Sequence, residues 1–211
     1  MILWTRRRSQ GAAALAEVLG WQYVNGRRQP LDSIAWGRKS NKYEELQKLA
    51  EAGISVPKAS LELTIECDLG RTFKHSQARD LLTPFRPGID TADYYTQWVE
   101  TVREHRVHVF DEEVIRVQMK QSDGPESHPW IRSSSSGWTL VARPEYTKLL
   151  PKGARTVAKL AVEALGYPWG AVDIGTKPDG GIVVFEVNSA PGLKCAATLQ
   201  TYARHMAERF N

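Results

Sequence analysis

The sequence is poor in cysteine and has no recognisable zinc motif. Its 211 residues include only two cysteines, Cys67 and Cys195, which form no CxxC pair. Two isolated cysteines exclude a disulfide framework and are typical of a reducing compartment. The five histidines form no HExxH or paired CxxC/HxxxH pattern. A structural or catalytic zinc site is therefore without support.

Long apolar runs are also missing. No stretch approaches the roughly 20 apolar residues of a membrane helix. The opening MILW is too short for a signal peptide, and its positive charges follow the apolar stretch instead of preceding it. With 42% hydrophobic and 25% charged residues, the composition is that of a globular protein with a core. We expect a cytoplasmic protein that does not contact a membrane.

The chain lacks an acidic excess, and its formal net charge of +4 favours anionic partners. Its one dense basic run, Arg6 to Arg8, is not interleaved with aromatic residues as a base-stacking platform would be, and we interpret it as solvated surface. No helix-turn-helix, zinc-finger or RNP signature is present. These absences argue against nucleic acid as a partner, although a basic nucleic-acid-binding module stays an alternative.

Apolar periodicity predicts several helices and short strands. Helices are expected over 11–20, 41–53, 153–166 and 196–209, and short strands over 33–37 and 94–99. The segment 128–146 predicts a strand that holds Arg132, then a flexible serine-rich turn and another short strand. The alternation of elements before residue 59 indicates a small α/β unit.

A charged hairpin is predicted in REHRVHVFDEEVIRVQMK, residues 103–120. Two runs of alternating residues flank the acidic turn, so that one face is apolar and the other polar. The residues expected to face inward are Val107, Val109, Ile115, Val117 and Met119. The opposite face carries Glu104, Arg106, His108, Arg116, Gln118 and Lys120. That polar face either contacts water or lines a cleft for a polyanion.

A second hairpin is predicted in WGAVDIGTKPDGGIVVFEVN, residues 169–188. Strict alternation would bury Val183, Phe185 and Val187, and would place Val184, Glu186 and Asn188 on the opposite face. The hairpin can bring Asp173 beside Glu186. A set of oxygen ligands without Cys or His suits a hard cation such as Mg²⁺. The alternative is the solvated polar face of a half-exposed hairpin.

The order of these motifs resembles the ATP-grasp superfamily. The resemblance runs from Asn41 onward, through NKYEELQKLAEAGISVPKA, the charged hairpin, ALGYPWGAVDIG and DGGIVVFEVNSAPGL. Its most specific piece is Asp173 with Glu186-x-Asn188, followed by the Ala190–Gly192 turn. Within the superfamily the chain is similar to carboxylate-amine ligases of the ribosomal-protein glutamate ligase type, in a compact form like phage variants.

The resemblance implies an α+β fold in which antiparallel sheets clamp ATP. It implies a short N-terminal α/β domain over 1–59. The central subdomain, with the lid and the adenine side, would span 60–127, and the C-terminal subdomain, with the metal and phosphate side, would span 128–211.

The resemblance also implies roles for individual residues. The metal ligands would be Asp173, Glu186 and Asn188, and the catalytic cations at the terminal phosphates would be Lys120 and Arg132. The ribose ligand would be Glu104, and the adenine hinge would be Gln97, Trp98 and Val99. The phosphate-binding residue before the lid would be Arg71, with Lys74 and His75 as alternatives. The lid differs from the family pattern because its side chains are basic where glycine is usual.

The function implied is an ATP-dependent ligase with Mg²⁺ that joins a carboxylate to an amine through an acyl phosphate. Its substrates would be small molecules or peptides. An ATP-grasp kinase that phosphorylates a hydroxyl is an alternative, as is a degenerate fold that only binds a partner. The oligomeric state is not readable from the sequence.

Overall fold

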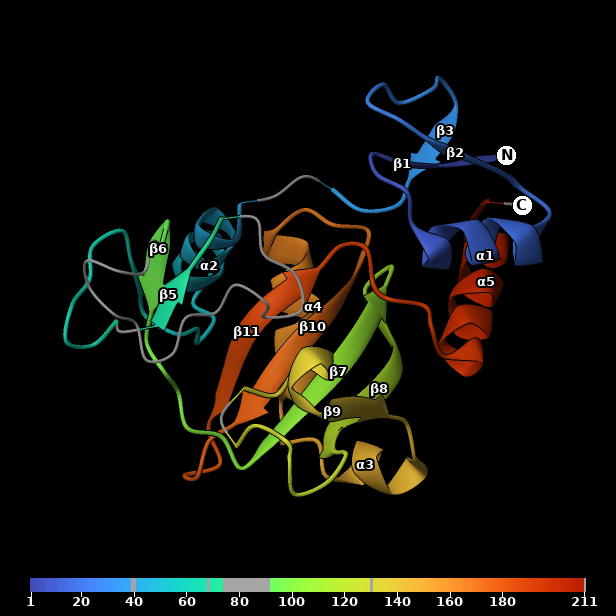
Figure 1. Cartoon of the computed structure of the whole chain (residues 1–211). Coiled ribbons are helices and arrows are strands. Elements are labelled where there is room, and N and C mark those ends of the chain that lie inside the picture. Colours follow the sequence, from blue (N-terminus) through green and yellow to red (C-terminus); the bar gives the residue numbers. More distant parts are fainter. Residues whose placement is uncertain (39–40, 68, 74–91, 130, 211) are drawn as a thin grey trace.

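The computed structural model describes residues 1–38, 41–67, 69–73, 92–129 and 131–210, and in this part of the chain the strands form three sheets (Figure 1). The strands are β1 (Ile2–Thr5), β2 (Gln22–Asn25), β3 (Ser33–Ala35), β4 (Ala59–Ser60), β5 (Leu69–Arg71), β6 (Tyr94–Thr96), β7 (Arg103–Phe110), β8 (Glu113–Ser122), β9 (Trp138–Val141), β10 (Trp169–Thr176) and β11 (Ile182–Asn188).

The helices are α1 (Gln10–Leu19), α2 (Lys42–Glu51), α3 (Pro144–Lys148), α4 (Ala154–Ala164) and α5 (Ala196–Phe210), with a short 3₁₀ helix, η1 (Ser134–Ser136). Four of the helices, α1, α2, α4 and α5, agree closely with the apolar periodicity, whereas α3 and the 3₁₀ helix were not predicted. None of the described helices is both long and apolar enough to cross a membrane. The cytoplasmic location stays a prediction.

The N-terminal unit is a parallel sheet in the order β2-β1-β3. Helix α1 follows β1; it is capped by Ser9, whose side chain accepts a hydrogen bond from the Ala12 amide, and it ends at Gly20 in the left-handed conformation. The last helix, α5, returns to pack against α1 (Figure 1). Buried Tyr202 and Met206 of α5 share one core with Leu3 and Leu15.

The central sheet is antiparallel, in the order β11-β10-β7-β8-β9. Helix α4 covers one face, and Ala158 and Ala161 pack there against Val107, Val172 and Val187. Because side chains alternate along a strand, the polar residues of β7, β8 and β10 lie on the opposite face. The candidate site lies on that polar face.

A third, small sheet has the order β4-β6-β5 and lies beside α2 (Figure 1). Helix α2 is capped by Asn41, whose side chain accepts a hydrogen bond from the Tyr43 amide, and it packs against β11, α4 and β4. The mixture of helices with antiparallel sheets confirms the α+β prediction. The domain boundaries at 59/60 and 127/128 stay a prediction.

The predicted alternation along β11 is wrong at Val184 and Phe185. Asp173 is opposite Glu186, but Ile174 is opposite Val184, so one extra residue is inserted at Phe185. This β-bulge reverses the faces beyond it. Val184 is therefore fully buried in the core under α4, and Phe185 lies on the side of Glu186, in the lining of a hollow.

A second bulge corrects the predicted charged hairpin. His108 is opposite Arg116 and Val109 is opposite Val114, so Ile115 is the additional residue. Ile115 therefore leaves the face of Val117 and packs into the core between α1 and α5. The strand expected over 94–99 is also shorter, because β6 ends at Thr96.

Gly175 generates a stability prediction because its surroundings leave no room for a side chain. A Cβ at this position would lie 2.5 Å from Thr101 Cγ2 and 2.7 Å from the Phe185 ring. We expect Gly175→Ala to lower the free energy of unfolding by about 1–3 kcal/mol through overpacking. Urea denaturation measures this change. In Gly26→Ala, where a Cβ has no neighbour within 4 Å, the change should stay below about 1 kcal/mol.

Candidate active site

Three oxygen-bearing side chains meet on the β10–β11 hairpin. Asp173 of β10 is directly opposite Glu186 of β11, and Asn188 follows two residues later. The Asn188 amide nitrogen donates a 2.8 Å hydrogen bond to Glu186 Oε1. The side chain of Asp173 is 5% exposed and that of Glu186 is 28% exposed, so a ligand can reach the pair from the side of Glu186. The structure thus brings the predicted metal ligands together; their role in metal binding stays a prediction.

Asp173 is held by a bidentate ion pair with Arg106. The Arg106 Nε and Nη2 atoms donate to the two carboxylate oxygens at 2.6 and 2.8 Å. The pair forms because the β7–β10 register places Arg106 opposite Asp173. Burial alone would raise the pKa of Asp173, but Arg106 and Lys120 outweigh it and hold that pKa well below its usual range. Asp173 is therefore a carboxylate at any physiological pH.

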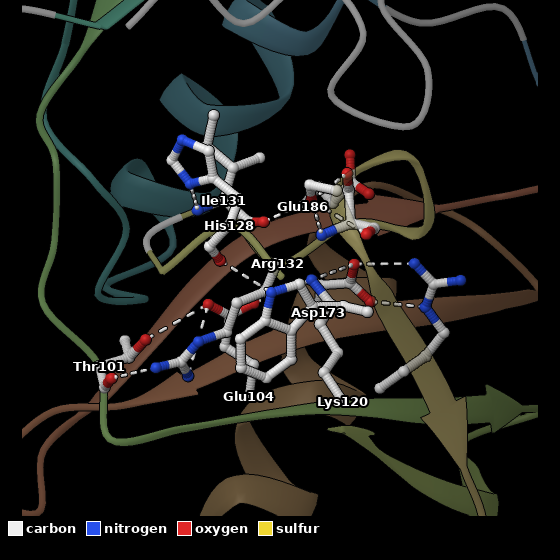
Figure 2. Close-up of polar contacts among 12 residues, drawn as sticks. Thr101, Glu104, Lys120, His128, Ile131, Arg132, Asp173 and Glu186 are labelled. Carbon is white, nitrogen blue, oxygen red and sulfur yellow. Dashed lines mark hydrogen bonds and ion pairs between the residues drawn. The ribbon is translucent and has the colours of Figure 1, made fainter. Parts of the chain in front are cut away.

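Lys120 and Arg132 converge on Glu104, as Figure 2 shows. Lys120 Nζ lies 2.8 Å from Glu104 Oε2 and 3.7 Å from Asp173 Oδ2. Burial alone would lower the pKa of Lys120, but the two carboxylates outweigh it and raise that pKa. Arg132 Nη1 lies 3.9 Å from Glu104 Oε1. Cations and acids thus alternate across this face of β7, β8 and β10.

Arg132 lies outside any strand, contrary to the sequence prediction. Its Nη2 donates to the Thr101 carbonyl at 2.8 Å, and its guanidinium lies 5.0 Å from the Trp138 ring centroid. The serines that follow form η1, where the Ser136 hydroxyl donates to the Ile131 and Ser133 carbonyls. Since serine hydroxyls satisfy the local backbone, this stretch is an ordered hydrogen-bonded turn.

Lys42, the first residue of α2, reaches the site from the opposite side of the hairpin. Its Nζ lies 2.8 Å from Glu45 Oε2 and 4.0 Å from Glu186 Oε2, and it donates to the Val187 carbonyl at 2.9 Å. Burial alone would raise the pKa of Glu186, but Lys42 reverses this and lowers it. Glu45, itself buried, also accepts a hydrogen bond from the Tyr167 hydroxyl at 2.8 Å.

A small hollow separates α2 and the small sheet from β11. Its lining includes Lys42, Arg71, Tyr94, Phe185 and Glu186. Arg71 lies in β5, and its Nε donates to Thr96 Oγ1 at 2.9 Å. The predicted phosphate-binding Arg71 thus shares a hollow with the predicted metal ligand Glu186. The alternatives Lys74 and His75, with the rest of the lid, lie outside the described residues.

The predicted adenine hinge, Gln97 to Val99, connects the small sheet to the central one. It follows β6 directly, and the Gln97 amide donates to the Lys58 carbonyl at 2.9 Å. Trp98 is 44% exposed. The segment therefore presents backbone and an aromatic ring beside the junction of two antiparallel sheets, while its contact with adenine stays a prediction.

The polar face of the charged hairpin divides into two parts. Glu104, Arg106 and Lys120 take part in the site, whereas His108 and Gln118 are buried beneath α5. His108 Nε2 lies 2.8 Å from the Gln118 carboxamide oxygen, and its Nδ1 lies 3.2 Å from the Tyr202 hydroxyl. Burial lowers the pKa of His108 to about 4. His108 is therefore a neutral packing residue.

The donor set fits a magnesium ion better than a softer metal. In the described part of the chain no group of three or more His, Cys, Asp or Glu side chains gathers as a metal site. The hairpin supplies two carboxylates and an amide, all hard oxygen donors. Carboxylate oxygens have about four lone-pair positions between them, so Asp173 retains free ones beyond its bonds to Arg106.

Sequence reasoning did not place Arg106, Lys42 or Glu45 in the site. Arg106 was on the predicted polar face, but the register that pairs β7 with β10 is not visible in the sequence. The sequence carries a signal for Lys42: a cation is unfavourable in the first turn of a helix, so its presence there calls for another contact. Lys42 and Glu45 also share the i, i+3, i+4, i+7 stripe of Leu46 and Leu49, which places their charges on the buried face.

Comparisons with known proteins support the resemblance at the level of the fold. No protein-family model matches the sequence, and no curated protein sequence matches it significantly. Among solved structures, the chain is similar to the ATP-grasp ligase PsnB complexed with minimal precursor, Mg and ADP, with a TM-score of 0.66 and 10% identity over 100% of this chain and 97% of that one.

Two further similar structures are the D-cycloserine synthetase DcsG and the D-alanine–D-alanine ligase from Bacillus anthracis. DcsG has a TM-score of 0.63 and 14% identity, with 100% of both chains covered. The Bacillus anthracis enzyme has a TM-score of 0.59 and 12% identity over 98% of this chain and 92% of that one. At these identities the likeness shows the fold, and the predicted resemblance is confirmed to that extent: the chain has the ATP-grasp fold.

Proposed function

We propose that this protein is an ATP-dependent ligase that joins a carboxylate to an amine. One observation carries the proposal: Asp173 and Glu186 sit side by side on adjoining strands, each held by a cation, Arg106 and Lys42 respectively. The ATP-grasp fold supports nucleotide use, and similar structures are described as ligases.

Asp173, Glu186 and Asn188 would hold Mg²⁺, and ATP would be the nucleotide. Bound there, the ion would supply positive charge that offsets the negative charge of the nucleotide phosphates. The similar PsnB structure is described with Mg and ADP. The hard oxygen donors of the hairpin support Mg²⁺ here as well. The cations that alternate with acids on the same face support the nucleotide.

In the proposed reaction, a substrate carboxylate oxygen attacks the γ-phosphorus of ATP and ADP leaves. The amine then attacks the acyl carbon of the resulting acyl phosphate, an amide bond forms and phosphate departs. The chain's contribution is to position two mutually repelling anions and to neutralise charge as the phosphoryl group moves. Lys120 and Arg132 are suited to this because the surrounding carboxylates keep them fixed and Lys120 fully charged.

Gln97 to Val99, Glu104 and Arg71 would complete the nucleotide site. Arg71 and Glu186 line one hollow, which supports a phosphate position between β5 and β11. Because arginine binds phosphate in a bidentate manner, Arg71 can serve where the family uses lysine. Glu104, held between Lys120 and Arg132, would bind the ribose.

Peptides are candidate substrates as well as small molecules. PsnB and the macrocyclase MdnC from Microcystis aeruginosa MRC, both similar in fold, are described with precursor peptides. The test is to incubate the protein with ATP, Mg²⁺ and pools of amino acids or short peptides, to record ADP formation and to analyse products by mass spectrometry. A new amide supports ligation, whereas a phosphoester would identify a kinase.

Replacing Glu186 tests the metal assignment. We expect Glu186→Gln to keep the fold and to lower magnesium-dependent ADP release by about 10²-fold or more, because a preorganised charge at the phosphates is lost. Circular dichroism measures whether the fold is kept, and a coupled ADP assay measures the rate of ADP release. Glu113→Gln, which changes an exposed carboxylate on β8, is the matched control and should leave the rate unchanged. Magnesium-dependent ADP release that persists in Glu186→Gln would contradict the assignment.

Replacing Arg106 tests the ion pair beneath the site. Arg106→Gln removes the bidentate partner of buried Asp173 and leaves only Lys120, 3.7 Å away; we expect a loss of about 3–5 kcal/mol in unfolding free energy at pH 7. Asp173 has a depressed pKa in the folded state, so the pair's contribution is present above the unfolded pKa of about 3.9 and is lost as the pH falls further. The difference from wild type should therefore shrink in acid.

Two comparisons make this result specific. Arg103→Gln, which changes an exposed residue of the same strand, should alter stability by less than about 0.5 kcal/mol. The double variant R106Q/D173N should be more stable than R106Q alone, since no buried charge is left unpaired. A pH-independent loss in R106Q would mean that the pair does not act as described.

A further inference from the structure

Six arginines lie in the three loops at the carboxyl edge of the parallel sheet. Arg6, Arg7 and Arg8 follow β1, Arg27 and Arg28 follow β2, and Arg38 follows β3; all six are exposed. We call this set the arginine edge. It is not visible as a cluster in the sequence, where 32 positions separate its first and last members. The strand order creates it.

The register of the sheet brings these loops together. Thr5 is level with Asn25, and Trp4 is level with Ala35. The Gly26 amide donates to the Thr5 carbonyl, and the Trp36 amide donates to the Trp4 carbonyl, so all three strands leave the sheet at one edge. Three neighbouring strands span about 10 Å, which is the length of roughly three residues of an extended peptide.

The arginine edge adjoins the end of the β10–β11 hairpin. The Arg38 amide donates a 2.9 Å hydrogen bond to Ser189 Oγ, one residue beyond Asn188. Gly37 touches Ala190 so closely that a Cβ would lie 2.7 Å from the alanine Cβ. On the other side, Gly11 of α1 lies against Leu193. The arginine edge therefore lies next to the residues that directly follow Asn188.

Three of these charges, Arg6 to Arg8, lie where they disfavour helix α1. Arg6 to Arg8 directly precede Ser9, the cap of α1, and the first turn of α1 has no acidic residue. Cations at a helix N-terminus are unfavourable because the helix dipole is positive there. Among the described residues, none of the arginines of the first two loops has a carboxylate partner within ion-pair distance. Positive charge without a compensating carboxylate favours an anionic ligand at this edge.

We propose that the arginine edge binds an acidic peptide segment and delivers one of its carboxylates to the site. The inference rests on the proposed ligase function and assigns its carboxylate substrate. Guanidinium groups match carboxylates in bidentate geometry. Nucleic acid fits less well, because no described aromatic residue in these loops is exposed for base stacking.

The test is direct binding without ATP, measured as fluorescence anisotropy of fluorescein-labelled hexaglutamate. We expect the wild type to bind hexaglutamate and not hexaglutamine, with an affinity that falls as salt increases. R6Q/R7Q/R8Q should raise the Kd for hexaglutamate by at least about tenfold, equivalent to about 1.4 kcal/mol. Its melting temperature should not fall, since it removes cations from a helix N-terminus.

The matched control is K152Q/R155Q/K159Q, which removes three exposed cations near α4 on the other side of the central sheet. It should change the Kd by less than about twofold. R27Q/R28Q is a second variant, in a different loop, and should weaken binding by about threefold or more. An equal loss in the control, binding of hexaglutamine, or no loss in either arginine variant would overturn the proposal. Tighter binding of a single-stranded hexanucleotide would instead favour nucleic acid and would also overturn it.

The two proposals fail in different ways. If hexaglutamate binds as expected but no ADP forms with any acceptor, the ligase function is wrong while the arginine edge stands. If ADP forms with other substrates and R6Q/R7Q/R8Q neither weakens hexaglutamate binding nor slows turnover, the arginine edge is wrong while the ligase stands. E186Q should keep its affinity for hexaglutamate, because Glu186 lies outside the edge.

Discussion

The cross-strand contact between Arg106 and Asp173 is the constraint on which the site depends. It joins β7 to β10 at the centre of the largest sheet and fixes the carboxylate that faces Glu186. Bringing a buried acid, a second acid and an amide together is unfavourable without compensating charge. Arg106, Lys120 and Lys42 supply that charge from three different elements, β7, β8 and α2. Fold and site are therefore specified by the same contacts.

Much of the fold could be predicted because its signals are local. Caps such as Asn41 and Gly20, and the periodic apolar stripes of α1, α2 and α4, are properties of short segments. The two long hairpins could also be predicted from local signals. The errors at Val184 and Ile115 have one cause: each follows from a β-bulge, which shifts the alternation by one residue and has no reliable mark in a single sequence.

From the residue pattern alone, without the resemblance, the candidate site was predictable only where its parts lie within one hairpin. Asp173, Glu186 and Asn188 are close because a short turn joins their strands, and that turn is readable from glycine and proline. Arg106 and Lys42 reach the same point through pairing between distant segments, which no local pattern records. Arg132 illustrates the opposite case. Its side chain lies beside Glu104, yet the backbone that carries it lies before a serine-bonded turn and not in a strand.

The packing of α5 against α1 has a consequence for how the chain folds. Tyr202 and Met206 complete the core of Leu3 and Leu15, although the two pairs of residues lie far apart along the chain. Contacts between such distant segments close a long loop and form slowly. We therefore expect the unit that carries the arginine edge to close after the central hairpins, whose strands are joined by short turns.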